Sequence, residues 1–134
     1  MADYRETVDY ILGIPLFAQK IGKENLSSLL CRLGNPEKAV PAIHVAGTNG
    51  KGSTCRALAQ MLAARGYRVG LFISPHLVSI NERIQINGTN ISDDDFVSAF
   101  ETVKGQFMEH PSFFEVMFAM AAVYFRQQKC DFAV

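Results

Sequence analysis

Apolar residues follow two kinds of spacing along the chain, and each kind predicts a different element. Three short apolar runs of strand length, residues 42–46, 68–73 and 130–134, predict strands. Stretches with apolar residues three and four positions apart predict helices at residues 3–12, 24–33 and 53–65, after Ser92, and from Pro111 to about Gln128. Helices that alternate with strands in this way predict an α/β fold.

A glycine-rich turn joins the strand at residues 42–46 to the helix at residues 53–65. It consists of Gly47, Thr48, Asn49, Gly50, Lys51, Gly52 and Ser53. The first amides of a helix have no partner within it, and the aligned peptide dipoles add positive charge there, so anions bind at such an end. Lys51 supplies a point charge for the outer phosphates, and a nearby hydroxyl can reach a magnesium ion. The turn therefore predicts binding of a nucleoside triphosphate.

This turn differs from the usual pattern G-x-x-x-x-G-K-[ST] at two positions. Val45 takes the place of the first glycine, and Gly52 follows Lys51, so that the hydroxyl comes one residue late, at Ser53. A glycine-rich turn before a helix can also be purely structural. Because the lysine, the hydroxyl and the strand-to-helix setting agree with one another, we favour the binding interpretation.

The segment Ser-Pro-His-Leu from Ser74 follows directly on the second strand. The strand, loop, helix, strand order predicts a parallel sheet, and open α/β sheets place their ligands at the carboxyl ends of the strands, where Ser74 stands. The third strand begins at Cys130, and the sequence stops at Val134. Phosphate-loop enzymes commonly hold magnesium with an acidic residue at the end of another strand. We therefore expect a fragment, truncated at the third core strand.

Three groups of polar residues have both a structural and a functional interpretation. The carboxylates at residues 93–95 either compensate the dipole of a helix capped by Ser92 or bind a metal. We favour the first alternative, with the carboxylates facing solvent, because consecutive helical residues point in different directions. Ser112 and Glu115 are spaced as a capping box, which leaves Glu115 as a cap or as a ligand. Arg83 either neutralises a substrate carboxylate or pairs with Glu82.

Composition indicates one globular domain or part of one. The chain has 134 residues, 49% hydrophobic and 19% charged, and a formal net charge of zero, which gives no support to nucleic acid as a partner.

The longest apolar run, residues 116–125, is about half of the roughly 20 residues that a membrane span needs. Without a secretion signal at its start, the protein is expected to be cytoplasmic. The three widely spaced cysteines predict reduced thiols, with neither a disulfide framework nor a zinc site.

Four segments occur in a specific order and spacing. They are His-Val-Ala-Gly-Thr-Asn-Gly-Lys-Gly-Ser from His44, Gly-Tyr-Arg-Val-Gly-Leu-Phe-Ile-Ser-Pro-His-Leu from Gly66, Asn-Glu-Arg-Ile from Asn81, and Ser-Phe-Phe-Glu from Ser112. Together they resemble the amino-terminal portion of the folylpolyglutamate synthase and dihydrofolate synthase family, over nearly the whole chain. The resemblance implies the Mur ligase fold, here a P-loop-containing parallel sheet flanked by helices.

The same resemblance implies the reaction, the cofactors and the site residues. The reaction is ATP-dependent addition of L-glutamate to the γ-carboxylate of folates through an acyl phosphate, with ATP and Mg²⁺ as cofactors. Many bacterial members of the family also act as dihydrofolate synthase, with dihydropteroate as the acceptor. Residues 47–53 would contact ATP, with Lys51 as the catalytic residue and with Ser53 and Ser74 as magnesium ligands, whereas His76 would shape its loop. The substrate-binding residues would be Ser112, Phe113, Phe114, Glu115 and Arg83.

Residues 1–134 would then form the amino-terminal part of the ATP- and folate-binding domain. The rest of that domain and a carboxyl-terminal glutamate-binding domain would be absent, so the isolated chain is expected to be inactive, and the full-length protein to be a monomer. Two alternatives are a Mur-type ligase of cell-wall amino acids and a non-catalytic nucleotide-binding module. The former usually has threonine after the lysine and lacks the combination of Ser-Pro-His-Leu with Asn-Glu-Arg-Ile.

Overall fold

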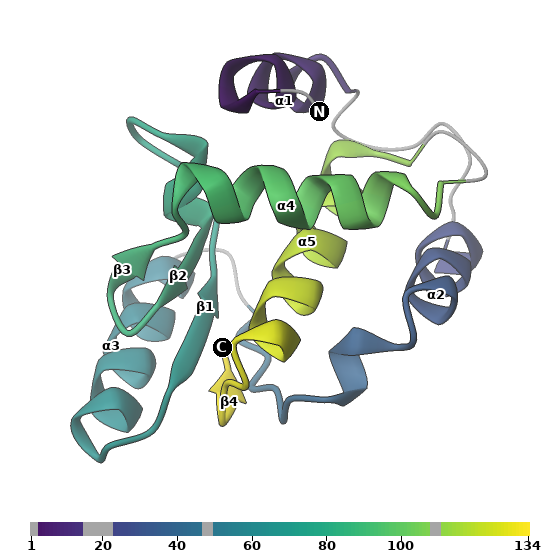
Figure 1. The fold of residues 1–134 in the computed structure, drawn as a ribbon. Helices are drawn as coiled ribbons and strands as arrows, with labels where there is room; N and C mark the ends of the chain where they lie inside the picture. Colours follow the sequence, from purple (N-terminus) through teal and green to yellow (C-terminus); the bar gives the residue numbers. More distant parts are fainter. Residues whose placement is uncertain (1–2, 15–22, 47–49, 108–110) are drawn as a thin grey trace.

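A computed structural model describes residues 3–14, 23–46, 50–107 and 111–134 (Figure 1). The helices are α1 (Tyr4–Leu12), α2 (Lys23–Arg32), α3 (Lys51–Ala64), α4 (Asp93–Lys104) and α5 (Phe113–Gln127), with two 3-10 helices, η1 (Pro36–Lys38) and η2 (Ile80–Arg83). The strands are β1 (Val69–Phe72), β2 (Ile84–Ile86), β3 (Thr89–Asn90) and β4 (Phe132–Ala133). The predicted α/β class is confirmed, and a helix lies at each of the five predicted places.

The strands form one mixed sheet in the order β3-β2-β1-β4. β1 runs parallel to β4, as the strand, loop, helix, strand order predicts, and antiparallel to β2, so the complete sheet is mixed. The physical reason is that residues 73–83, which connect β1 to β2, contain no crossover α-helix and simply reverse the chain. β2 and β3 form a hairpin around Asn87 and Gly88, which both have positive φ.

The predicted strand at residues 42–46 is only a single parallel bridge, between Ala42 and Ala133. Ala133 donates its N–H to the Pro41 carbonyl at 2.9 Å, and Ile43 donates to the Ala133 carbonyl at 2.7 Å. Because β4 has only two residues, it cannot support a longer ladder beside this segment. The predicted length of this strand is therefore wrong, whereas its predicted direction, parallel to β4, is confirmed.

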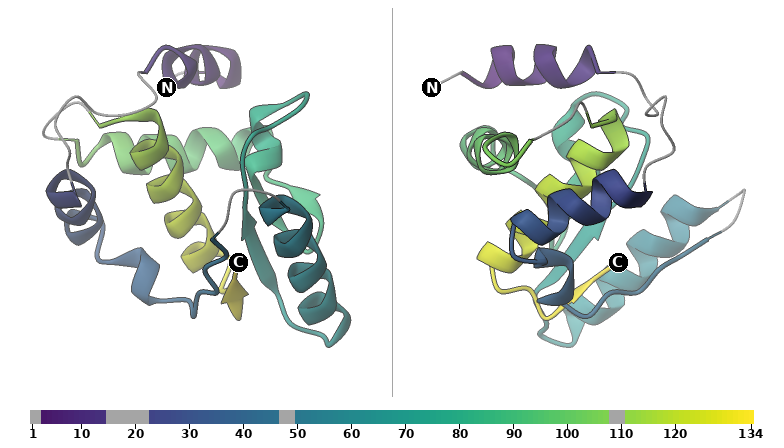
Figure 2. Two further views of the ribbon diagram at one scale, coloured as in Figure 1. Left: turned by 180° about the vertical axis from the view of Figure 1, so that it is seen from behind. Right: turned by 90° about the vertical axis from the view of Figure 1, so that its right-hand side faces the viewer.

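Side chains of β1 alternate between two layers of helices. Val69 and Leu71, with Ile73 just after the strand, pack against α3. Phe72 points to the other side, where its ring packs against Phe118 of α5. Accordingly α3 covers one face of the sheet and α5 the other, with α4 beside α5 (Figures 1 and 2).

Gly70 lets α5 approach the sheet closely. A Cβ at this position would lie 2.6 Å from Cδ1 and 2.7 Å from Cγ of Phe125, so it would overlap the base of a ring whose residue is 4% exposed. We expect Gly70→Ala to lower the free energy of unfolding by about 1–3 kcal/mol, the usual cost of overpacking a core, as measured by urea denaturation. Gly105→Ala is the control, because its Cβ would meet only ordinary contacts at 3.5 and 3.6 Å. Equal losses in the two variants would contradict this account.

Candidate functional site

The amino-terminal end of α3 lies where the sequence predicts the phosphate-binding turn. Gly50 caps this helix with φ at 74°, a left-handed conformation that favours glycine. The helix begins at Lys51, earlier than predicted, and Thr54 donates its N–H to the Gly50 carbonyl at 3.0 Å. The N–H groups before Thr54 belong to the first turn and are available to an anion. Gly47, Thr48 and Asn49 lie outside the described residues.

The described residues leave open space around this end of the helix. A Cβ placed on Gly50 or on Gly52 would meet none of their atoms within 4 Å. Ser53 follows in the same turn and is exposed. Free amides, the positive end of a 14-residue helix and open space together suit a phosphate group.

Ser74 lies at the same edge of the sheet as the glycine-rich turn. It follows closely on β1, whereas the turn follows the segment that starts at the Ala42 bridge. Both β1 and that segment run parallel to β4, which lies between them, so their carboxyl ends point the same way, about two strand spacings or 10 Å apart. Ser53 and Ser74 are both exposed, and their hydroxyl oxygens are of the kind that Mg²⁺ prefers. This donor chemistry fits the expected metal ion.

Glu82 holds the backbone of the loop that follows Ser74. Its carboxylate accepts hydrogen bonds from the N–H groups of Leu77, Val78 and Ser79 at 2.9, 2.9 and 2.8 Å. These three donors lower the pKa of Glu82 to about 2. The loop is therefore organised by a carboxylate within the motif Asn-Glu-Arg-Ile, and Glu82 is not the partner of Arg83.

Protonation of Glu82 is expected to loosen this loop in acid. Since folding lowers its pKa, the contribution of Glu82 is fully present above the ordinary pKa of 4.5 and is lost as the pH falls toward about 2. Amide hydrogen exchange of residues 77–79 should show protection at pH 6 that declines through this window. Glu82→Gln should show weaker, pH-independent protection, while Glu101→Gln on α4 should behave as wild type. Undiminished protection in Glu82→Gln would refute the prediction.

Asn81 connects this loop to two helices. Its side chain is 4% exposed, and its amide nitrogen donates to the Ile91 carbonyl at 2.8 Å and to Oδ1 of Asp93 at 3.1 Å. The Tyr4 hydroxyl, on α1, donates to Oδ1 of Asn81. The sequence analysis names Asn81 only as the start of the Asn-Glu-Arg-Ile segment and gives it no role, because its partner Tyr4 is 77 positions away.

Arg83 contacts His76 and Phe113. Its Nε donates to Nδ1 of His76 at 2.8 Å, and its guanidinium carbon lies 4.9 Å from the centre of the Phe113 ring. Burial lowers the pKa of His76, the positive charge of Arg83 lowers it further, and Glu82 opposes both effects. The predicted role of His76 in shaping its loop agrees with this contact. The structure shows no ion pair between Arg83 and Glu82, so this interpretation of Arg83 is not supported.

Ser112 and Glu115 form the predicted capping box at the start of α5. Ser112 donates its N–H to Oε1 of Glu115 at 2.8 Å, and Glu115 donates its N–H to the Ser112 hydroxyl at 3.2 Å. Glu115 is 7% exposed, and its second oxygen, Oε2, is buried with no hydrogen-bond partner among the described residues. A buried carboxylate oxygen without a donor is costly, so a donor from outside the described residues, such as a ligand N–H, would stabilise it.

The two phenylalanines of this segment differ in exposure. Phe113 is buried beneath Arg83, as a core aromatic would be. Phe114 is 48% exposed, and its ring centre lies 6.0 Å from that of Phe72. Only Phe114 therefore offers an open aromatic surface, next to the capping box.

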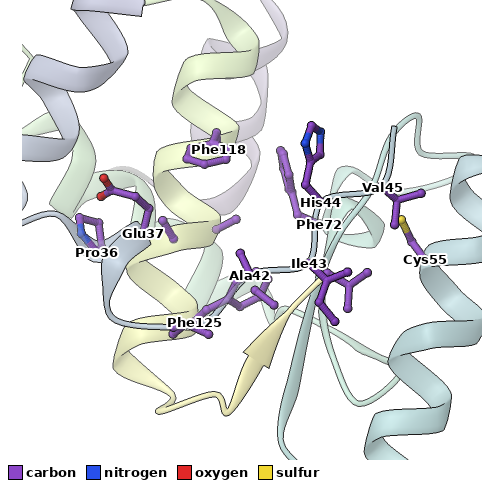
Figure 3. A pocket seen from close by; sticks show the side chains of 15 residues that line it. Pro36, Glu37, Ala42, Ile43, His44, Val45, Cys55, Phe72, Phe118 and Phe125 are labelled. Atoms are coloured by element: carbon purple, nitrogen blue, oxygen red, sulfur yellow. The ribbon is translucent and has the colours of Figure 1, made fainter. Parts of the chain in front are cut away.

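A separate apolar pocket of about 410 Å³ lies between α5 and the segment that leads to the glycine-rich turn (Figure 3). Ile43, His44 and Val45 form one wall, and Phe118 and Phe125 of α5 form another. No described site residue from the sequence analysis lines it. The structure thus brings Arg83 and Phe113 into direct contact and places Ser74 at the edge of the sheet where α3 begins, while none of the described site residues lines this pocket.

Other predictions can be checked against the described residues. Asp93 and Asp94 are exposed and Asp95 is partly exposed, in agreement with the solvent-facing interpretation. All three cysteines lie in the described part of the chain, and none is in a disulfide. Within that part, no helix is both long and apolar enough to cross a membrane.

These features define an α/β domain in which helices flank a mixed sheet, which is the fold type of the Mur ligases. Within this class the chain is a homologue of the folylpolyglutamate and dihydrofolate synthases over almost its entire length.

Individual relatives support this relationship. Dihydrofolate synthase/folylpolyglutamate synthase of Bacillus subtilis is 40% identical over 139 residues, which is 98% of this chain and 32% of that protein. The crystal structure of folylpolyglutamate synthase from Thermotoga maritima matches with a TM-score of 0.91 and 41% identity, over 98% of this chain and 32% of that one. A folylpolyglutamate synthase complex with AMPPCP and folate matches with a TM-score of 0.93 and 39% identity, over 99% and 34%. No family model matches the chain. The chain thus spans about a third of the length of its relatives.

Proposed function

We propose that residues 1–134 are the amino-terminal part of the ATP- and folate-binding domain of a folylpolyglutamate synthase that also accepts dihydropteroate. The observation that carries this proposal is the match, over 99% of the chain, to a folylpolyglutamate synthase solved with an ATP analogue and folate. The open amino-terminal end of α3 supports it independently. The full-length protein would be a cytoplasmic monomer with a further, glutamate-binding domain.

The reaction divides into two balanced steps. A carboxylate oxygen of the folate attacks the γ-phosphorus of ATP, and the bond to the bridging oxygen breaks to release ADP and leave an acyl phosphate. The amine of glutamate then attacks the acyl carbon, forms the amide, loses a proton and expels inorganic phosphate. Activation is needed because a carboxylate is a poor acylating group at neutral pH.

Residues of this chain would bind the phosphates and orient them. The first amides of α3 and the charge of Lys51 would stabilise the transferring phosphoryl group, as donors of positive charge do in such sites. Gly47, Thr48, Asn49, Gly50, Gly52 and Ser53 would complete the cradle. Ser53 and Ser74 would hold Mg²⁺, which when bound neutralises phosphate charge.

The acceptor substrate would bind beside the start of α5. Oε2 of Glu115 would accept from an N–H of the substrate, Phe114 would contact its aromatic ring, and Arg83 would neutralise a carboxylate. Ser112 and Phe113 would support these three residues. The burial of Oε2 without a partner and the lack of a carboxylate partner for Arg83 among the described residues support this assignment.

Glutamate ligation by the full-length protein tests the proposal. Tetrahydrofolate and dihydropteroate should each support ADP release that depends on glutamate, and the 134-residue chain alone should give none. Use of neither acceptor by the full-length protein would overturn the folate assignment. Activity with a cell-wall precursor instead would favour a Mur-type ligase, and nucleotide binding without any ligation would favour a non-catalytic module.

A further inference from the structure

Arg83 is a cation with a fixed orientation and with no ion-pair partner in the part of the chain that the structure describes. Among the described residues its guanidinium donates one hydrogen bond, from Nε to His76, and its face lies on the Phe113 ring. It is partly buried, and no carboxylate in the described part of the chain forms an ion pair with it. A half-buried guanidinium loses hydration without compensation unless an anion binds it. Its two terminal nitrogens, with four N–H groups, remain for that anion.

His76 is the residue that fixes this orientation. Its Nδ1 lies 2.8 Å from Nε, so Nδ1 carries no proton and accepts. The ring is held in turn, because the backbone just after it, residues 77–79, is bound by the Glu82 carboxylate. Glu82 and Arg83 are neighbours in η2. Glu82 holds the backbone of the loop, and His76 of the same loop in turn orients Arg83. Such a closed arrangement leaves Arg83 little rotational freedom.

We infer that His76 is a positioning residue for Arg83, and that it orients the terminal nitrogens of Arg83 toward a carboxylate of the acceptor substrate. This inference rests on the proposed function, which supplies the carboxylate-bearing acceptor. His76 does not touch the substrate in this account. It acts by removing the entropy cost of ordering a long side chain before a bidentate contact forms.

Kinetics of the full-length protein test the inference. His76→Leu removes the acceptor for Nε and should raise the KM for tetrahydrofolate about tenfold, with kcat and the KM for ATP within about threefold of wild type. His76→Asn should restore the tetrahydrofolate KM to within about threefold, because the asparagine Oδ1 occupies the place of Nδ1 and also accepts. A purely structural loss would affect ATP and tetrahydrofolate alike and would overturn the inference.

A double-mutant cycle separates the positioning role from other effects. Arg83→Ala should raise the tetrahydrofolate KM more than His76→Leu does, and His76→Leu should have no further effect in the Arg83→Ala background. An undiminished effect of His76→Leu in that background would overturn the inference. If Arg83→Ala itself leaves the tetrahydrofolate KM unchanged, Arg83 does not bind the substrate and the inference falls with that assignment.

A spectroscopic readout keeps the inference distinguishable from the proposed function. In full-length protein labelled with ¹⁵N-arginine, the Nε–H of Arg83 should exchange slowly in wild type and in His76→Asn, and rapidly in His76→Leu. Rapid exchange in wild type would overturn the positioning role whatever the activity. If the Nε–H of Arg83 exchanges slowly but the full-length protein ligates no folate, the proposed function is wrong. The contact between His76 and Arg83 would still be demonstrated.

Discussion

Replacing Lys51 with alanine in the full-length protein is expected to lower kcat for glutamate ligation by about 10²–10³-fold, the usual cost of removing one group that stabilises developing charge. In the proposed site, the amides of the α3 end would bind phosphate in the ground state and in the transition state alike. The lysine charge matters more as negative charge moves onto the leaving oxygen, so kcat should fall further than the affinity for ATP does. Steady-state ADP release and direct nucleotide binding separate these two quantities.

Lys38→Ala is the matched control for this substitution. Lys38 is an exposed lysine at the end of η1, outside the candidate site, and its removal changes net charge by the same amount. Its kcat should stay within about twofold of wild type, and both variants should keep the wild-type unfolding temperature. A Lys51→Ala protein with kcat within about threefold of wild type would show that the glycine-rich turn is structural.

Local signals predicted much of the fold because the forces behind them act over a few residues. Ser92 caps α4, and Ser112 with Glu115 caps α5, since each side chain reaches amides three positions away. Asn87 and Gly88 adopt the positive φ values of a tight hairpin turn. These features depend only on neighbouring residues, and the sequence displays them directly.

Pairing partners could not be predicted in the same way. Residues 42–46 have the apolar composition of a strand, but the extent of a strand depends on its partner, and β4 offers only two residues. Composition sets the tendency to be extended, whereas ladder length depends on two segments about 90 positions apart. The same holds for the position of β2, which returns antiparallel without a helix.

In the candidate site, too, features that depend on neighbouring residues were predictable and contacts between distant segments were not. The glycine-rich turn and Ser74 are evident from sequence because phosphate binding depends on consecutive amides and on the order of strands and turns. The contact between Arg83 and Phe113, and that between Tyr4 and Asn81, join segments that only the folded chain brings together. For Arg83, the sequence left two partners open, and the structure shows a third, His76.

Glu115→Gln is expected to raise the KM for tetrahydrofolate about 10–100-fold while leaving stability almost unchanged. The glutamine carbonyl oxygen can accept from Ser112 N–H, as Oε1 does now, so the capping box persists. The amide NH₂ of the glutamine then occupies the position of Oε2, which is buried and has no partner among the described residues. A substrate N–H that Oε2 accepts would then face another donor, and losing a charge-assisted hydrogen bond in a buried site costs about 1.5–3 kcal/mol.

Ser112→Ala supplies the opposite pattern and thereby separates the two interpretations of Glu115. It removes the hydroxyl that accepts from the Glu115 N–H, so it should lower the free energy of unfolding by about 0.5–2 kcal/mol, the typical value of a helix cap. Its tetrahydrofolate KM should stay close to that of wild type, because Oε2 keeps its position and charge. If Glu115→Gln left the KM unchanged and only destabilised the protein, the carboxylate would be a cap alone. A high KM at full stability in Glu115→Gln, beside a normal KM at reduced stability in Ser112→Ala, would show that one buried carboxylate uses its two oxygens for different purposes.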